Sequence, residues 1–315
     1  MSELPAANKT KKELIQSRVL GYLILHTPPI ALHELEQAIH SCKGDRNALL
    51  KLGESFINYF IRPFKKYKGR TPVSSYHSSR SSSDEGVDIM MAEIKEAPKD
   101  HREAKRQALI RDGFRCVATG IYDLKAWDVP GMDEATIREA GAVYTRCAHI
   151  VPQFGYFNMT IDTEKDFSAS VLAVLQCFGY DLSKLDGTGV HSLSNVMTMQ
   201  YDPRRFFDEL KIWFEATEVK DCYCIKTVPR VHYGFLKQKI VFSSTPNLPA
   251  PSPGLLALHA TCAKVAHFSG AGQHIDELDE DTEGLPVLAN DGGSFDILNN
   301  ALWRSLGSIS SSIAS

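Results

Sequence analysis

One histidine stands in a setting where several kinds of chemistry are open to it. His149 lies in "TRCAHIVPQF" (145–154), at the end of an alternating run and directly before an Ile-Val-Pro segment. A neutral imidazole can take a proton from water, bind a metal ion, or lie in a core as a satisfied polar group. The choice between these depends on polar residues further along the chain and on the elements that bring them to His149.

The polar residues that could act with His149 lie in "GVHSLSN" (189–195) and "QYDPRRFFD" (200–208): His191, Asn195, Asp202, Arg204 and Asp208. Arg204 is permanently charged and only donates, so it can bind a phosphate but cannot bind a metal. We expect it to pair with Asp208, one helical turn later. Asp202, before Pro203, is read first as a helix N-cap, with a metal ligand as the alternative. His191 is a second polar group at the site or a loop histidine that bonds to backbone.

Helical patterns at the N-terminus predict a small helical unit at 1–70. Apolar residues recur at helical spacing over 11–25, 31–43 and 45–61. Asp45 is placed to cap the third of these helices, and Pro63 to end it. The basic "RPFKKYKGR" (62–70) is expected to be a solvated helix end, and the serine-rich 71–92 a flexible linker.

The positions expected to hold the candidate site lie in a second unit, 93–270. A charged helix, "KDHREAKRQALI" (99–110), precedes the segments "FRCVATGIY" (114–122) and "AVYTRCAHIV" (142–151), which we expect to pair as a hairpin. A packing helix is predicted at 163–178, and three antiparallel strands at 211–217, 222–228 and 238–244. A capped helix follows from 252 to 270. The acidic and serine-rich residues 271–315 are expected to form a poorly ordered tail. The predicted class is α+β.

Composition limits the classes of protein that need to be considered. The chain has 43% hydrophobic and 23% charged residues and a net charge of −3, which is ordinary for a folded protein and places any polyanion-binding surface locally. Its seven cysteines are odd in number and form no CxxC, so a disulfide framework is not expected. The apolar run "VLGYLILHTPPIAL" (19–32) is too short and too broken to span a bilayer. We therefore expect an intracellular protein, cytoplasmic or nuclear, with no membrane partner and with unknown protein partners.

Four motifs, in this order, resemble those of the HNH endonucleases, and the likeness is closest to fungal HNH-domain proteins. They are "RDGFRCVATG" (111–120), "CAHIVPQF" (147–154), "LSNVMTM" (193–199) and "FFDELKIWFE" (206–215). The resemblance implies a ββα-metal (His-Me finger) fold, elaborated here with helices and a small sheet. It also implies hydrolysis of DNA phosphodiesters with a divalent Mg, Mn or Zn ion. His149 matches the family's general base, and Asn195 matches the asparagine that holds the loop and orients that base.

Two positions depart from the pattern that this resemblance implies. The family's metal ligands stand immediately before the base and about nine residues beyond the asparagine, where this chain has Ala148 and Arg204.

Three hypotheses for the function follow from these departures. The protein is a nuclease with Asp202 or Asp208 recruited to the metal and Arg204 binding phosphate. Alternatively, it is an enzyme without metal or other cofactor that uses His149 and Arg204 on a substrate other than nucleic acid. In the third hypothesis it is a non-catalytic binding module.

Other polar groups receive structural interpretations. His259, Cys262 and His267 share one predicted helix, but their spacing does not bring all three to one point. Cys222 and Cys224 form a single pair on one strand face, which favours buried thiols over a zinc site.

Overall fold

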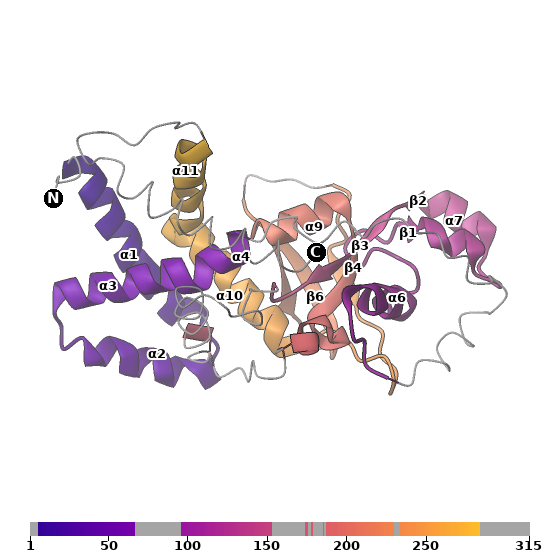
Figure 1. The fold of residues 1–315 in the computed structure, drawn as a ribbon, viewed down its shortest axis with the longest axis horizontal. Helices are drawn as coiled ribbons and strands as arrows, with labels where there is room; N and C mark the ends of the chain where they lie inside the picture. Colours follow the sequence, from indigo (N-terminus) through magenta and orange to yellow (C-terminus); the bar gives the residue numbers. More distant parts are fainter. Residues whose placement is uncertain are drawn as a thin grey trace. The chain divides into compact units, whose positions relative to one another are not determined.

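The part of the chain that the structure describes contains helices and three small sheets, which agrees with the predicted α+β class (Figure 1). The computed structural model describes residues 6–66, 96–152, 187–229 and 234–283, together with 174, 175, 178 and 185. These residues fall into two compact units, each described by itself below. Unit 1 takes residues 1–68, 153–182 and 261–315, and unit 2 takes residues 69–152 and 183–260. The predicted linker and most of the predicted helix 163–178 lie outside the described residues.

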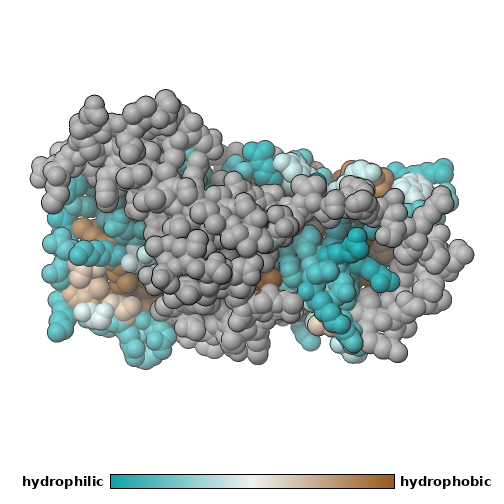
Figure 2. Space-filling model, in the orientation of Figure 1, coloured by the Kyte–Doolittle hydropathy of each residue, from teal (hydrophilic) through white to brown (hydrophobic). Residues whose placement is uncertain are grey.

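Unit 1 contains the predicted N-terminal helices. These are α1 (Ala6–His26), α2 (Pro29–Ser41) and α3 (Arg46–Phe56), followed by a π-helix, η1 (Ile57–Ile61), and by α4 (Arg62–Lys66). Asp45 caps α3 as predicted, since its side chain accepts a hydrogen bond from the amide of Ala48. Gly53 lies against the backbone of Gln16, where a larger residue would collide. On the described surface of these helices, Figure 2 shows apolar residues between hydrophilic ones.

The prediction that Pro63 ends the third helix is wrong. The helical path continues through Pro63 into α4, and the amide of Arg62 donates to the carbonyl of Ile57, five residues back. Proline has no amide hydrogen and its ring crowds the carbonyl four residues earlier. The wider π-helical turn directly before it fits this requirement, because such a turn uses a longer hydrogen-bond spacing.

Helix α11 (Ala271–Glu283) begins where we expected a poorly ordered tail, and residues beyond 283 lie outside the described part. Its acidic side chains meet cations of α4. Lys65 donates to Asp276 at 2.9 Å, and Arg62 lies 3.8 Å from Asp279. Both basic side chains are buried, so at Arg62 and Lys65 the prediction of a solvated helix end is wrong, while residues 67–70 of the basic segment lie outside the described part. Sequence composition showed two oppositely charged runs but not that they pair.

Unit 2 begins with α6 (His101–Arg111), which Asp100 caps by accepting from the amide of Glu103. Two short parallel strands follow, β1 (Tyr122–Asp123) and β2 (Ala142–Val143), separated by η2 (Leu124–Asp128) and α7 (Glu134–Ala140). The core of this half joins apolar residues of α6 to those of the strands, including Ala104, Ala108, Tyr122, Ile137 and Cys147.

Strand β3 (Thr145–His149) pairs with β4 (Val196–Gln200), and not with 114–122 as predicted. The register places His149 opposite Val196 and Thr145 opposite Gln200. The segment 114–122 instead closes a tight loop, in which the amide of Cys116 donates to Ile121 and that of Gly120 to Cys116. Gly120 has φ +84, a conformation that favours glycine. Helix α9 (Tyr201–Asp208) follows β4 directly, so the order is strand, strand, helix (Figure 1).

The predicted three-stranded antiparallel sheet is confirmed. Its strands are β5 (Ile212–Ala216), β6 (Cys222–Thr227) and β7 (Lys239–Val241), in that order. Helix α10 (Pro253–Ser269) ends before Gly270, at φ +82, as its sequence predicted. The described cysteines are free thiols. None of the helices in the described part combines the length and apolar character needed to cross a membrane.

Candidate metal centre

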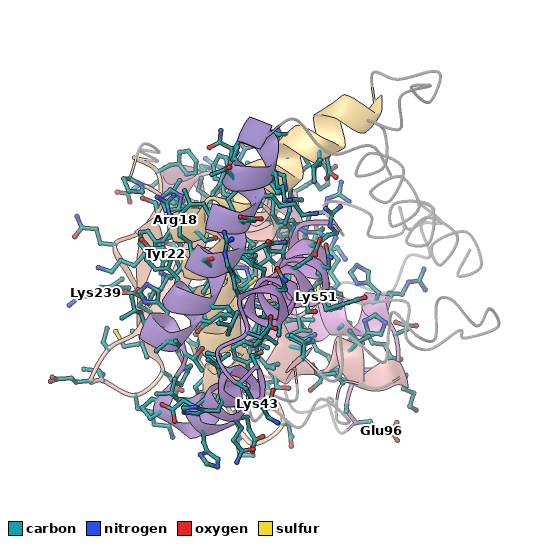
Figure 3. All side chains as sticks on the ribbon, turned by 90° about the vertical axis from the view of Figure 1, so that its left-hand side faces the viewer. Arg18, Tyr22, Lys43, Lys51, Glu96 and Lys239 are labelled. Atoms are coloured by element: carbon teal, nitrogen blue, oxygen red, sulfur yellow. The ribbon has the colours of Figure 1, made fainter. Side chains whose placement is uncertain are left out.

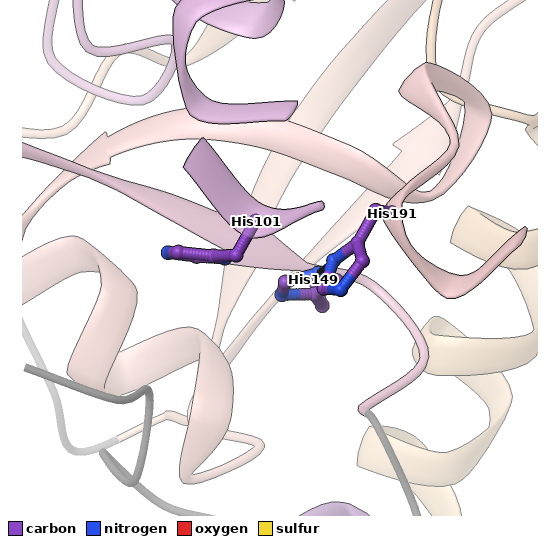
Figure 4. A group of neighbouring side chains, drawn as sticks. All are labelled: His101, His149 and His191. Atoms are coloured by element: carbon purple, nitrogen blue, oxygen red, sulfur yellow. Dashed lines mark hydrogen bonds between the residues drawn. The ribbon is translucent and has the colours of Figure 1, made fainter. Parts of the chain in front are cut away.

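Three histidines from three separate segments of unit 2 meet at one place (Figure 4). His101 is the first residue of α6, His149 the last of β3, and His191 the last of a short 3₁₀ helix, η4 (Gly187–His191). Each offers one ring nitrogen, and these three atoms lie within 4.8 Å of one another. Among the residues that the structure describes, no other group of three or more His, Cys, Asp or Glu side chains is so placed.

The closest pair of ring nitrogens matches the spacing that a metal ion requires. Nε2 of His149 lies 3.2 Å from Nδ1 of His191. Two imidazole nitrogens bound tetrahedrally to one zinc ion at about 2.0–2.1 Å stand roughly 3.4 Å apart. The His101 ring stacks beside His149, with centroids 5.6 Å apart and an interplanar angle of 24°. A shift of its side chain by less than roughly 1.5 Å would complete such a geometry.

All three imidazoles are held in the neutral form that metal binding needs. Burial lowers the pKa of His101 to about 4, helped by His191 and by the cations of Arg204 and Lys105. Burial also lowers the pKa of His149 well below 6.5, and the neighbouring rings and Arg204 act in the same direction. The pKa of His191 is lowered by burial against the opposing charge of Asp100. Each of these imidazoles is therefore neutral at neutral pH and has one unprotonated ring nitrogen to offer a metal ion.

Asn195 fixes the segments that carry two of these histidines. It is fully buried in η5 (Leu193–Asn195). Its Oδ1 accepts from the amide of Val151 at 2.9 Å, and its Nδ2 donates to the carbonyls of Val151 and Val190 at 3.0 and 2.9 Å. Val151 lies two residues after His149, and Val190 directly precedes His191. Asn195 thus acts as a positioning residue, since its side chain is occupied by backbone partners.

A buried ion pair attaches the same loop to α6. Nε of Arg111 lies 2.8 Å from Asp112, and its guanidinium donates to the carbonyls of Leu193 and Val196 at 2.7 and 2.8 Å. Asp112 in turn accepts from the amide of Thr198 in β4. Helix α6, which presents His101, is therefore tied to both ends of η5. The helix that carries His101 and the loop that positions His191 are therefore joined by hydrogen bonds.

Arg204 and Asp208 form the predicted ion pair on α9. Nε of Arg204 lies 3.4 Å from Oδ2 of Asp208, and both side chains are largely buried. Burial raises the pKa of Asp208 to about 6, and Arg204 opposes this shift. Arg204 is also a fixed cation near the histidines, and its charge lowers the pKa of His101 and of His149.

The predicted site residues divide into two sets. The structure brings His149 and His191 together, with Asn195 behind them and Arg204 nearby. It does not bring Asp202 or Asp208 into the group of converging ligands. Asp202 is exposed in the first turn of α9, and Gln200 occupies the N-cap position, so the predicted capping role of Asp202 is wrong. Ala148 is buried and offers no ligand.

Sequence reasoning missed His101. The three histidines stand far apart in the chain, so no local spacing marks them as a set. His259, which was considered as a ligand, is buried with Nε2 3.1 Å from the carbonyl of Phe207 and stacks on that ring. No family model, no curated protein and no solved structure matches this chain.

Proposed function

We propose that unit 2 is a metal-dependent hydrolase of phosphodiesters, in which His101, His149 and His191 hold one transition-metal ion. The convergence of their three ring nitrogens carries the proposal. Three protein ligands leave a fourth position open for water or substrate, as in catalytic zinc sites. A metal site requires its imidazoles in the unprotonated form, and burial gives these three that form.

The donor set indicates which metal the site would take. Imidazole nitrogens suit zinc, copper, nickel and iron, whereas magnesium prefers oxygen ligands and keeps several waters. The group contains three imidazoles and no carboxylate. Of the Mg, Mn and Zn ions that the sequence led us to expect, zinc therefore fits these residues best.

The other residues of the site supply orientation and charge. When bound, such an ion lowers the pKa of water and polarises phosphate oxygens. Arg204 would bind an anionic oxygen of the phosphate, because a guanidinium matches phosphate geometry. Asp208 holds Arg204 through their ion pair. In this proposal His149 is a metal ligand and not the general base expected from its sequence position.

A relation to the HNH endonucleases is part of the proposal. Two features support it: the order β3, β4, α9, and the loop-holding bonds of Asn195. The ligand set would differ from the one that the resemblance implies, because His101 and His191 would replace the positions occupied by Ala148 and Arg204. This relation is the reason for proposing a phosphodiester, and DNA in particular, as the substrate.

Zinc binding tests the proposal directly. We expect the metal-free protein to bind one equivalent of Zn²⁺ by calorimetry, and His101→Ala or His191→Ala to weaken binding by roughly a hundredfold or more, because each removes one of three ligands. His40→Ala, at an exposed position of α2, is the matched control and should bind as the wild type does. Absence of zinc binding, or equal affinity in all variants, would refute the metal centre.

Hydrolysis tests the reaction. Bis(p-nitrophenyl) phosphate carries a single phosphodiester, and we expect its turnover to require added Zn²⁺ and to be lost in His101→Ala.

A second candidate function, metal-independent catalysis, is favoured by the 3.2 Å contact between His149 and His191, which could orient His149 as a base without metal. That candidate predicts turnover that survives complete chelation and is lost in His149→Ala.

A further inference from the structure

Basic and aromatic side chains gather on the surface of unit 2 beside the histidine cluster. Lys125 and Arg146 are exposed, and Lys105 is partly buried. Each exposed cation has an exposed aromatic residue two positions away: Trp127, 41% exposed, and Tyr144, 69% exposed. We call these five residues the basic-aromatic strip. Over the described surface around α6, Figure 2 shows mainly hydrophilic residues.

The Asp123 carboxylate holds the two halves of the strip side by side. Strands β1 and β2 are parallel, with Asp123 opposite Val143, so the segments that follow them leave in the same direction. Oδ1 of Asp123 accepts from the amide of Lys125 at 2.9 Å, and Oδ2 accepts from the amide of Thr145 at 2.8 Å. One buried side chain thus fixes the backbone at Lys125 and directly before Arg146.

Lys105 joins the strip from α6. Its neighbours Ala104 and Ala108 pack in the same core cluster as Cys147, which directly follows Arg146. Burial lowers the pKa of Lys105, the Asp123 carboxylate opposes this shift, and the cations of Lys125 and Arg146 lower the pKa further. Lys105 stands one helical turn after His101, and its charge also lowers the pKa of that histidine. The strip therefore reaches the edge of the candidate metal centre.

The cations of the strip are available to a ligand. Within the described residues, no salt bridge joins Lys105, Lys125 or Arg146 to a carboxylate. Asp123 acts on Lys105 electrostatically, but its own oxygens accept from Thr145 and from the amide of Lys125. Three cations that form no salt bridge within the described residues leave a local positive surface on a chain whose net charge is −3.

We propose that the basic-aromatic strip binds a single nucleic-acid strand, with Lys105, Lys125 and Arg146 contacting phosphates and Tyr144 and Trp127 stacking on bases. Cations interleaved with exposed aromatic rings are the arrangement by which proteins hold single strands without reading sequence. Inorganic polyphosphate offers the charge but has no rings to stack, so the two exposed aromatics favour a nucleic-acid strand. The role of the strip in turnover rests on the proposed hydrolase function, but strand binding itself does not.

The experiment measures strand binding by the metal-free full-length protein. A fluorescein-labelled oligothymidylate is titrated in chelator at low salt and followed by anisotropy, with Lys125→Gln/Arg146→Gln as the test variant. Both positions are exposed, so the fold should survive. The matched control is Lys226→Gln/Lys239→Gln, which removes the same charge from exposed positions of β6 and β7; Lys239 points away from the protein in Figure 3.

We expect the wild type to bind and the test variant to bind roughly tenfold more weakly at low salt, while the control binds as the wild type does. The slope of log affinity against log salt should fall by about 1.4 in the test variant, because each lost phosphate contact contributes about 0.7 for a single strand. No binding by the wild type, or equal loss in the control, would overturn the proposal.

One further measurement tests the base contacts. Another distinguishes the strand-binding proposal from the hydrolase proposal. Tyr144→Ala should weaken oligothymidylate binding roughly fivefold or more and leave competition by inorganic polyphosphate unchanged, because only bases stack. Unaltered oligothymidylate binding by this variant would overturn the assignment to a nucleic-acid strand. Zinc-dependent turnover of bis(p-nitrophenyl) phosphate without strand binding would refute the strip alone. Strand binding without any turnover would refute the hydrolase alone.

Discussion

Replacing Asn195 by alanine tests how the histidine cluster is held. The variant loses three side-chain hydrogen bonds to backbone groups of Val151 and Val190, with lengths of 2.9 to 3.0 Å. At about 1 kcal/mol for each bond, the loss is about 3 kcal/mol, and the unpaired buried backbone groups raise it toward about 4 kcal/mol. With a slope of about 2 kcal/mol per molar urea, the unfolding midpoint should fall by about 1.5–2 M.

Tryptophan fluorescence during urea unfolding measures this midpoint. Trp127 and Trp213 both lie in unit 2, and the third tryptophan, Trp303, is replaced by phenylalanine in every protein compared. The control is Gln238→Ala, which removes an exposed amide side chain from the same unit and should leave the midpoint unchanged. An Asn195→Ala midpoint within about 0.3 M of the wild type would refute the reasoning, because bonds of this number cannot be lost from a buried site at so small a cost.

Zinc affinity should change little from pH 7.5 to about 6.5, because the pKa of His101 is lowered to about 4 and those of His149 and His191 are also lowered from 6.5; calorimetry across this range checks it. Asp208→Asn should gain stability relative to the wild type as pH rises from 4 to 7. The folded-state pKa of about 6 lies above the unfolded value of 3.8, so the wild type loses stability over that window, as paired urea titrations would show. Arg111→Met should lower the free energy of unfolding by about 3–5 kcal/mol, because it leaves Asp112 buried without its cation. Equal stability of Arg111→Met and wild type would exclude that pair as a support of the site.

Local signals in the sequence predicted the elements that depend on neighbouring residues. The strand alternation at 211–244 and the Pro253 start and Gly270 end of α10 were sufficient, because pattern and capping act within one or two turns. The Arg204 and Asp208 pair was predicted for the same reason, since both residues lie on one helix. The importance of His149 and Asn195 was inferred from a resemblance, and the bonds of Asn195 agree with the holding role expected of it.

Interactions between distant segments could not be predicted in this way. β3 was assigned the wrong partner, because the apolar run at 114–122 resembled a strand and the true partner, β4, lies far along the chain. His101 went unnoticed because its relation to His149 and His191 exists only after α6 packs on those strands. The pairing of Lys65 with Asp276 joins two charged runs that each resembled solvated chain. Each of these interactions depends on tertiary packing, because its partners lie too far apart in the sequence to be read from one short segment.

The division of the chain into interleaved segments affects how the protein can be made and dissected. Unit 1 requires residues before 69 and residues after 260. Its N-terminal helices therefore leave the ribosome long before α11, which belongs to the same unit. Until α11 has been synthesised, Lys65 and Arg62 lack the carboxylates that they meet in the finished protein. A fragment that ends near residue 260 should therefore leave unit 1 incomplete and expose it to chaperones and proteases. A stop codon far from the histidines would in this way remove the protein from the cell without touching its candidate site.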